Sequence, residues 1–350
     1  MRTINSLTHF IHKHFLLILL SAYCLAIIVP GPGLLLRNIV FGQVRLFGSN
    51  LALSPSLLML ALMLFNAGLG IQIQEIKHLV SRPQLAIIGL LANSLVPIIL
   101  VFLLHGLAAP WHNQDEVQNL LTGLALIVSM PIAGSSTAWS QNANGNLSLS
   151  LGMVFLSTFL SPITTPLVLH TFSHITVGDY SEDLQELAQH GTHIFMGLTV
   201  VIPSLAGMLL HFKLGENKVT SLKPLMKLLN FVLLLLLNYS NAATSLPQAF
   251  SKPDFDFLFM IFIVAAILCL FAFGSGWLLS KLFKTDKADM ASLMFGLGMN
   301  NNGVGIVLAA STLSDHPAVL LPMIFYMLIQ QMTAAFIDRK FFQTQDKLTV

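Results

Sequence analysis

The sequence predicts an all-α polytopic membrane protein with ten transmembrane helices, and three observations support this fold class. Hydrophobic residues make up 55% of the 350-residue chain and charged residues only 9%, with a mean hydropathy of +0.78. Apolar stretches of about 20 residues, the length that crosses a bilayer, recur along the whole chain. Basic residues are concentrated in alternate loops. Because such a chain has too little polar surface to cover a soluble globule, we expect it in a lipid bilayer.

The apolar stretches delimit the expected spans. They cover residues 15–35, 51–71, 85–108, 119–142, 147–169, 194–212, 228–246, 257–280, 290–311 and 317–337. None of the 17 basic and 15 acidic residues falls inside these limits. An even number of spans places both termini on the same face of the membrane.

The distribution of basic residues predicts the orientation. The face that holds the termini carries fourteen of them: Arg2, Lys13, Lys77, Arg82, Lys213, Lys218, Lys223, Lys227, Lys281, Lys284, Lys287, Arg339, Lys340 and Lys347. The opposite face carries only Arg37, Arg45 and Lys252. The positive-inside rule therefore predicts a protein of the plasma (inner) membrane with cytoplasmic N- and C-termini.

Two spans are interrupted by small and polar residues at corresponding places. The breaks are Pro131-Ile-Ala-Gly-Ser-Ser-Thr137 in the fourth span and Gly296-Leu-Gly-Met-Asn-Asn-Asn-Gly303 in the ninth, the fourth of its own half. Five spans per half is an odd number, so the second copy would enter the membrane in the opposite orientation, as an inverted repeat. We expect a first repeat at 1–172, an exposed acidic outer loop at 173–192, a second repeat at 193–342 and a cytoplasmic tail at 343–350.

The first break offers a flexible backbone and three hydroxyl groups. Gly134 is followed by Ser135, Ser136 and Thr137. A hard cation such as sodium is held by several oxygens at once, and carbonyls of unwound helix together with hydroxyls supply them. The alternative is that the small residues only let helices pack closely while the hydroxyls bond back to their own helix.

The second break contains three consecutive carboxamides, Asn300, Asn301 and Asn302. On a helix they cannot all face one way, so some point toward other helices or a cavity, and each is costly to bury without partners. Asn93 in the third span and Gln330 in the tenth lie at a similar depth and are candidates to complete a binding cavity between the two breaks, or alternatively to act as interhelical hydrogen-bonding groups.

At this point the sequence resembles the bile acid:sodium symporter family. The resemblance lies in Phe65-Asn-Ala-Gly-Leu-Gly-Ile71, in the stretch from Gly145 through Pro166, and in Gly298-Met-Asn-Asn301. It extends over residues 55–340. It implies two inverted five-helix repeats, a core domain of spans 3, 4, 5, 8, 9 and 10, a panel domain of spans 1, 2, 6 and 7, and broken helices 4 and 9 that cross.

The resemblance also implies site residues. One family sodium site would fall on Ser136, Thr137, Ser150, Val154 and Gly296, and the other on Asn93, Gly296, Leu297, Met299 and Asn300. We therefore expect cation binding by Ser136, Thr137, Ser150, Gly296, Met299 and Asn300, with sodium as the only metal and no other cofactor. Substrate binding is expected at Asn93, Gly134, Ser135, Asn301, Asn302 and Gln330.

The departures from the family pattern bear on coupling. Gly296 stands where the family has a bridging glutamate, and no span contains a carboxylate. Burying cations without compensating charge is unfavourable by several kcal/mol per ion. The sequence therefore predicts a secondary active transporter of small organic anions whose sodium coupling is reduced or altered, and leaves open a sodium-independent facilitator or channel on the same fold.

Other classes of function have little support. Ser135 and Ser136 are conceivable nucleophiles of an intramembrane enzyme, but no histidine shares their depth, no span contains a pair of aspartates, and no His-Glu-x-x-His motif occurs. No catalytic residues are therefore expected. The basic residues form no run suited to nucleic acid. The expected partners are an organic anion and the lipid bilayer.

Overall fold

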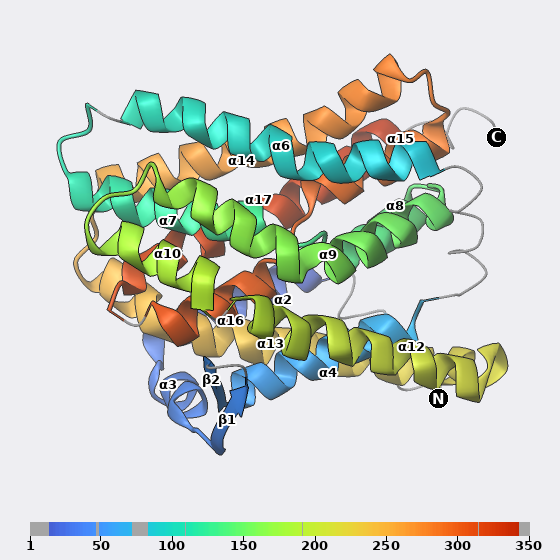
Figure 1. Ribbon diagram of the computed structural model, residues 1–350, viewed down its shortest axis with the longest axis horizontal. Helices are drawn as coiled ribbons and strands as arrows, with labels where there is room; N and C mark the ends of the chain where they lie inside the picture. The colour runs from blue at the N-terminus through green and yellow to red at the C-terminus, as the bar shows by residue number, and fades with distance from the viewer. Residues whose placement is uncertain are drawn as a thin grey trace.

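The computed structural model describes residues 14–46, 49–71, 83–108, 110–190, 192–313 and 315–342. Most of these residues lie in helices that run roughly along the long axis of the molecule (Figure 1). The expected all-α class is confirmed, with one addition. Strands β1 (Gly42–Leu46) and β2 (Ser49–Leu53) pair antiparallel and form a hairpin at one edge of the bundle. The expected tail at 343–350 lies outside the described residues.

The first expected span is not one continuous helix. Helix α2 (Phe15–Ile28) and helix α3 (Gly31–Asn38) are bent by 92° relative to each other. A span over 15–35 was expected from the sequence, but this bend was not. Pro30 is the reason for the bend, since a proline disfavours the helical conformation of the residue before it, and Val29 has left the helical region with φ −130° and ψ 70°. The Tyr239 hydroxyl donates a hydrogen bond to the Val29 carbonyl at 2.6 Å, which stabilises the corner.

The rest of the first half contains the first broken span. Its helices are α4 (Pro55–Leu69), α6 (Pro83–Ala108), α7 (Gln114–Ser129), α8 (Ser135–Asn142) and α9 (Leu147–Ser173). Helices α7 and α8 together cover the expected fourth span, and the residues between them are not helical.

The acidic segment after α9 is helical, which corrects the expectation of an exposed loop over 173–192. Helix α10 (Asp179–His190) packs against α9. Leu184 and Leu187 are buried on its inner face. Asp179 and Glu182 lie in its first turn, where negative charge interacts favourably with the helix dipole. The sequence interpretation considered only the acidic side chains and overlooked this apolar face.

The second half contains the second broken span. Its elements are α11 (Thr192–Phe195), the π-helical segment η1 (Met196–Val201), α12 (Ile202–Leu214), α13 (Glu216–Ser251), α14 (Phe255–Leu282), α15 (Lys287–Gly298), α16 (Asn302–Thr312), η2 (Pro317–Val319), α17 (Leu320–Ile337) and η3 (Asp338–Phe342). Helices α15 and α16 together correspond to the expected ninth span.

The helices are compatible with a polytopic membrane protein. Among the described residues, six helices are long and apolar enough to cross a membrane, or seven if the bent pair α2 and α3 counts as one span. The turns between α8 and α9, between α12 and α13, and between α14 and α15 lie at the same end of the bundle, at the right of Figure 1. Lys213, Lys281 and Lys284 belong to two of these turns or to the helix ends beside them.

Helix α4 and helix α12 pack with their backbones in close contact. A Cβ atom added at Gly68 would meet the backbone of Ser204, and one added at Gly207 would meet the backbone of Phe65. Only glycine permits this approach, because any side chain at either position would push the helices apart. The glycine-rich end of α4 therefore serves interhelical packing.

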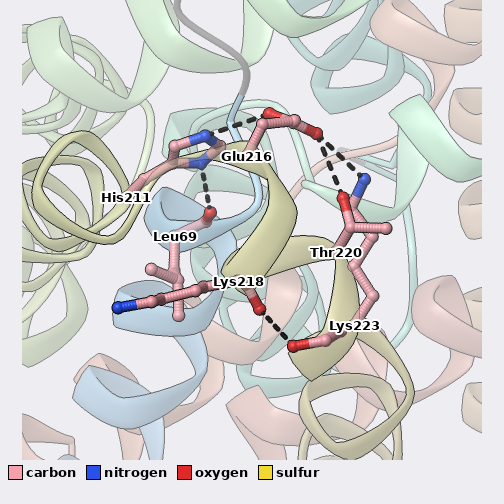
Figure 2. A network of polar contacts seen from close by, with 7 residues as sticks. Leu69, His211, Glu216, Lys218, Thr220 and Lys223 are labelled. Carbon is pink, nitrogen blue, oxygen red and sulfur yellow. Dashed lines mark hydrogen bonds and ion pairs between the residues drawn. The ribbon is translucent and has the colours of Figure 1, made fainter.

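A polar network closes this helix pair at the end where α13 begins (Figure 2). The buried ring of His211 places Nδ1 2.8 Å from the Leu69 carbonyl oxygen and Nε2 3.2 Å from a carboxylate oxygen of Glu216. Glu216 also accepts a hydrogen bond from Thr220 at 3.3 Å and lies 3.6 Å from the Lys223 ammonium group. Through these contacts the end of α4 is joined to α12 and to the first turn of α13.

Candidate functional site

The two breaks meet in the interior of the bundle, as expected. The backbone N–H of Ala133 donates to the Met299 carbonyl at 2.8 Å, and that of Asn301 donates to the Pro131 carbonyl at 2.8 Å. These bonds flank an antiparallel bridge between Ile132 and Asn300. Backbone groups that leave a helix inside a membrane must find partners in the protein. Here the two interruptions supply partners to each other.

The first interruption is caused by local sequence. Pro131 cannot donate a backbone hydrogen bond, and Met130 before it is extended, with φ −78° and ψ 145°. The freed N–H of Ile132 donates to the Ser157 hydroxyl at 3.1 Å, and this hydroxyl in turn donates to the Val154 carbonyl at 3.0 Å. Ser157 on α9 thus supports the crossing. Sequence reasoning gave it no role, although a serine within an apolar span was the available signal.

Four of the expected site residues form one buried amide network. The Asn300 side chain accepts from Asn93 Nδ2 at 3.2 Å and donates to the Ile127 carbonyl at 3.0 Å. Gln330 Oε1 accepts from the Asn300 backbone N–H at 3.0 Å and from Asn302 Nδ2 at 3.2 Å. Gln330 Nε2 donates back to the Asn300 carbonyl at 3.3 Å. The network therefore joins α6, α7, the second break and α17.

The Asn301 side chain and the side-chain carbonyl of Asn302 differ from the rest of this amide network. Asn302 is buried, but its Oδ1 has no hydrogen-bond partner among the described residues. Asn301 is only half-buried and occupies the N-cap position of α16 without a side-chain capping bond. Both side chains thus keep hydrogen-bonding capacity that no partner among the described residues uses.

The hydroxyl groups of the first break form a second cluster. Ser150 Oγ donates to Thr137 Oγ1 at 3.2 Å, which joins α9 to α8. The Ser136 hydroxyl is completely buried and has no hydrogen-bond partner among the described residues. An orphaned buried hydroxyl costs about 1–3 kcal/mol, so a site of this kind is a natural place for a ligand. Gly134 and Ser135, in contrast, are exposed at the start of α8.

The surroundings of Gly296 are tightly filled. A Cβ atom at this position would lie 2.5 Å from the terminal methyl carbon of Met153, a fully buried side chain of α9. Met299 is also fully buried, and its carbonyl already accepts the bond from Ala133. Gly296 and Met299 can therefore contribute only backbone oxygens to a cation. In the described part of the chain, no three His, Cys, Asp or Glu side chains gather in an arrangement that suits a metal ion.

Two interrupted helices that meet inside a bundle of apolar helices define a class of protein, because secondary transporters build their binding sites from discontinuous helices of this kind. The chain belongs to the Sodium Bile acid symporter family, whose family model matches residues 57–250. It is thus a membrane protein of the sodium bile acid symporter kind, and several of its relatives are named as transporters.

Individual relatives are distant but cover most of the chain. It is similar to the uncharacterised protein YbaS of Bacillus subtilis, with 26% identity over 79% of this chain and 84% of the relative. The uncharacterised sodium-dependent transporter YocS of the same organism is 26% identical over 74% of this chain and 75% of the relative. The hepatic sodium/bile acid cotransporter of Rattus norvegicus is 22% identical over 78% of this chain and 71% of the relative.

Proposed function

We propose that the protein is a secondary active transporter of small organic anions that couples uptake to a single sodium ion. The observation that carries this proposal is the contrast between the two halves of the crossing. The hydroxyl cluster contains the unpartnered Ser136 oxygen, whereas the Asn93 and Asn300 side chains of the amide network bond to each other, and Asn300 also donates to the Ile127 carbonyl. In this proposal the hydroxyl cluster binds the ion, whereas hydrogen bonds within the protein occupy the place of the second ion site.

The hydroxyl cluster fits a sodium ion. Ser136, Thr137 and Ser150 provide neutral oxygens in a buried place, and carbonyls at the unwound start of α8 are the further ligands that a hard cation needs. In this proposal Ser136 Oγ is the central ligand, and the charge of the bound ion is balanced by the transported anion, since none of the ten expected spans contains an aspartate or a glutamate.

A second sodium ion does not fit equally well. Asn93 and Asn300 bond to each other at 3.2 Å, and Met153 fills the space beside Gly296. A second ion would have to break this amide pair without gaining a carboxylate. Separating bonded buried groups and burying an uncompensated charge are both unfavourable.

The starts of α8 and α16 are the proposed anion site. Neither helix has a side-chain cap at its N-terminus, so the positive end of each helix dipole is not met by a capping side chain. Several N–H groups of the first turns, among them those of Ser136 and Asn302, already donate to nearby backbone carbonyls. Ser135 and Gly134 at the start of α8 are exposed, and Gly134 faces Ala67 of α4, to which an added Cβ would lie at 4.0 Å. Asn301 and Asn302 supply the polar side chains on the other helix.

The membrane arrangement is part of the proposal. In this proposal the ten spans expected from the sequence are the six long apolar helices, the bent pair α2 and α3, the short apolar helix α4, and the interrupted pairs α7–α8 and α15–α16. We propose that they form two inverted repeats, at 1–172 and 193–342, in the inner membrane with both termini cytoplasmic. In this arrangement α4, α12 and α13 belong to the panel and the broken helices to the core.

The stoichiometry can be tested by uptake into proteoliposomes. Co-transport of one sodium ion with a monovalent anion moves no net charge, so an imposed potential should not change accumulation. With two sodium ions, 100 mV would contribute about 2.3 kcal/mol, or roughly a 50-fold change in the accumulation ratio. We expect a sodium gradient to drive concentrative uptake of labelled small carboxylates that is insensitive to a potassium–valinomycin potential.

Matched serine variants identify the ion site. Ser136→Ala should raise the sodium concentration for half-maximal uptake about tenfold, because the loss of one ligand oxygen costs about 1.4 kcal/mol of binding free energy. Ser140→Ala serves as the control, because the Ser140 hydroxyl is buried on the same helix but already paired with Ser292 at 2.8 Å. Sodium-independent, non-concentrative flux would favour the facilitator, and no flux of any anion would refute transport.

A further inference from the structure

A cavity of about 760 Å³ lies at the end of the bundle where α13 ends and α14 begins. Its walls come from the start of α7, the turn before α10, the end of α13, the start of α14 and the segment that leads into α17. None of the residues of the crossing lines it. In Figure 1 this end is on the left, opposite the α12–α13 turn. Its size suits a small organic solute.

The cavity is strongly acidic. Its charged lining consists of Asp115, Asp179, Asp254, Asp315 and Lys252. With the neutral form of His316, four aspartates and one lysine give a formal charge of −3. Acidic clefts of this sort focus a negative potential, which raises the local concentration of cations and repels anions.

The titration of neighbouring groups reflects this crowding of carboxylates. The pKa of Asp254 is raised, chiefly because its carboxyl group shares a hydrogen bond with Asp256. Partial burial and the nearby carboxylates of Asp115, Asp179 and Asp183 raise the pKa of the Tyr180 hydroxyl. Nearby carboxylates contribute to both shifts, although the largest cause is the shared hydrogen bond for the pKa of Asp254 and burial for the pKa of Tyr180.

An independent observation points to a ligand with N–H donors. Ser245 lines the cavity, is only 3% exposed, and its hydroxyl has no hydrogen-bond partner in the described part of the chain. One turn earlier on the same face of α13, the side-chain oxygen of Asn241 is also buried and without a partner among those residues. Both oxygens can accept a hydrogen bond, and leaving them unsatisfied is costly.

We propose that this cavity binds the ammonium group of a small organic amine, at a site separate from the proposed transport site. The aspartates provide a negative field for the ammonium group, and the Ser245 hydroxyl provides an acceptor at the cavity wall. An ammonium group is favoured over a metal ion, since no three acidic or histidine side chains in the described ranges converge as a metal site requires. The inference goes beyond the proposed transport function, because the cavity shares no residue with the crossing and its negative field repels the anions that are the proposed substrates.

A single reporter cysteine tests the site in the full-length protein. Gln248 is exposed and lines the cavity on α13, so Gln248→Cys in a Cys24→Ser background can be labelled with the neutral reagent N-ethylmaleimide. The remaining Cys269 is buried. Labelling is followed in nanodiscs with added 4-aminobutyrate, butylammonium or butyrate. We expect the two amines to halve the labelling rate near their dissociation constant, and butyrate to leave it unchanged.

Variants of the lining and a distant reporter make the result specific. Ser245→Ala and Asp115→Asn should each raise the half-protecting concentration of butylammonium about fivefold, the effect of one lost hydrogen bond or close charge. A Gln43→Cys reporter, at an exposed position of β1, should show no protection. Protection by butyrate, protection by no probe, or protection unchanged in both variants would overturn the proposal.

Transport assays separate this inference from the proposed function. If simple carboxylates are accumulated but no amine protects the Gln248→Cys reporter, the amine site fails while the transporter proposal stands. If the amines protect the Gln248→Cys reporter but no organic acid is taken up, the proposed function fails while the amine site stands.

Discussion

Replacing Gln330 by leucine removes the side chain that holds the second break in place. Gln330 is 2% exposed on α17 and takes part in three hydrogen bonds with the break. Its Oε1 is the acceptor for both the Asn300 backbone N–H and the Asn302 side chain. Leucine has a similar size, so the substitution removes these bonds while leaving only a small change in packing.

The cost follows from the groups left without partners. Side-chain hydrogen bonds between membrane helices are worth about 0.6 kcal/mol on average, which gives roughly 2 kcal/mol for three. An unsatisfied buried backbone N–H adds about 1–3 kcal/mol. We therefore expect Gln330→Leu to lower the free energy of unfolding by about 3–5 kcal/mol. Uptake should fall at least about tenfold, because the start of α16 loses its fixed position.

Gln331→Leu is the matched control on the next position of the same helix. Gln331 is only half-buried and accepts one bond, from Trp139 Nε1 at 3.3 Å. Its loss should cost less than about 1 kcal/mol. Thermal and denaturant unfolding in detergent, together with uptake per folded molecule, measures both effects. If Gln330→Leu is as stable and active as the unchanged protein, or if Gln331→Leu is equally damaging, the network does not hold the crossing as argued.

Two further predictions concern packing and charge. Gly276→Ala should destabilise the protein by about 1–3 kcal/mol and reduce uptake, because the added Cβ would lie 2.6 Å from the α15 backbone. Gly274→Ala on the same helix is the control: its Cβ meets nothing within 4 Å, so the variant should be neutral in thermal unfolding. The pKa of Asp183 is raised above 3.8, chiefly by partial burial, so its charged form disfavours folding. Asp183→Asn should therefore raise the melting temperature at pH 7, with the gain vanishing as the pH falls toward 3.8; an equal gain at every pH would contradict this cause.

Some structure was missed although its signals were local. The bend between α2 and α3 follows from Pro30, which the sequence analysis passed over because a window of hydropathy does not register backbone geometry. Helix α10 has buried Leu184 and Leu187, but its acidic side chains dominated the interpretation. The β-hairpin has no pattern strong enough to stand out within a chain of apolar helices.

The sequence alone determined that the chain is a helical membrane protein and where two of its helices break, because apolar length, proline and consecutive asparagines act on the backbone within a few residues. The tertiary structure decided which polar groups find partners. Asn93 meets Asn300 across 207 positions of sequence, while Ser136 meets none in the described part of the chain. These outcomes depend on how the packed helices are rotated and placed against each other, and no local pattern encodes that placement.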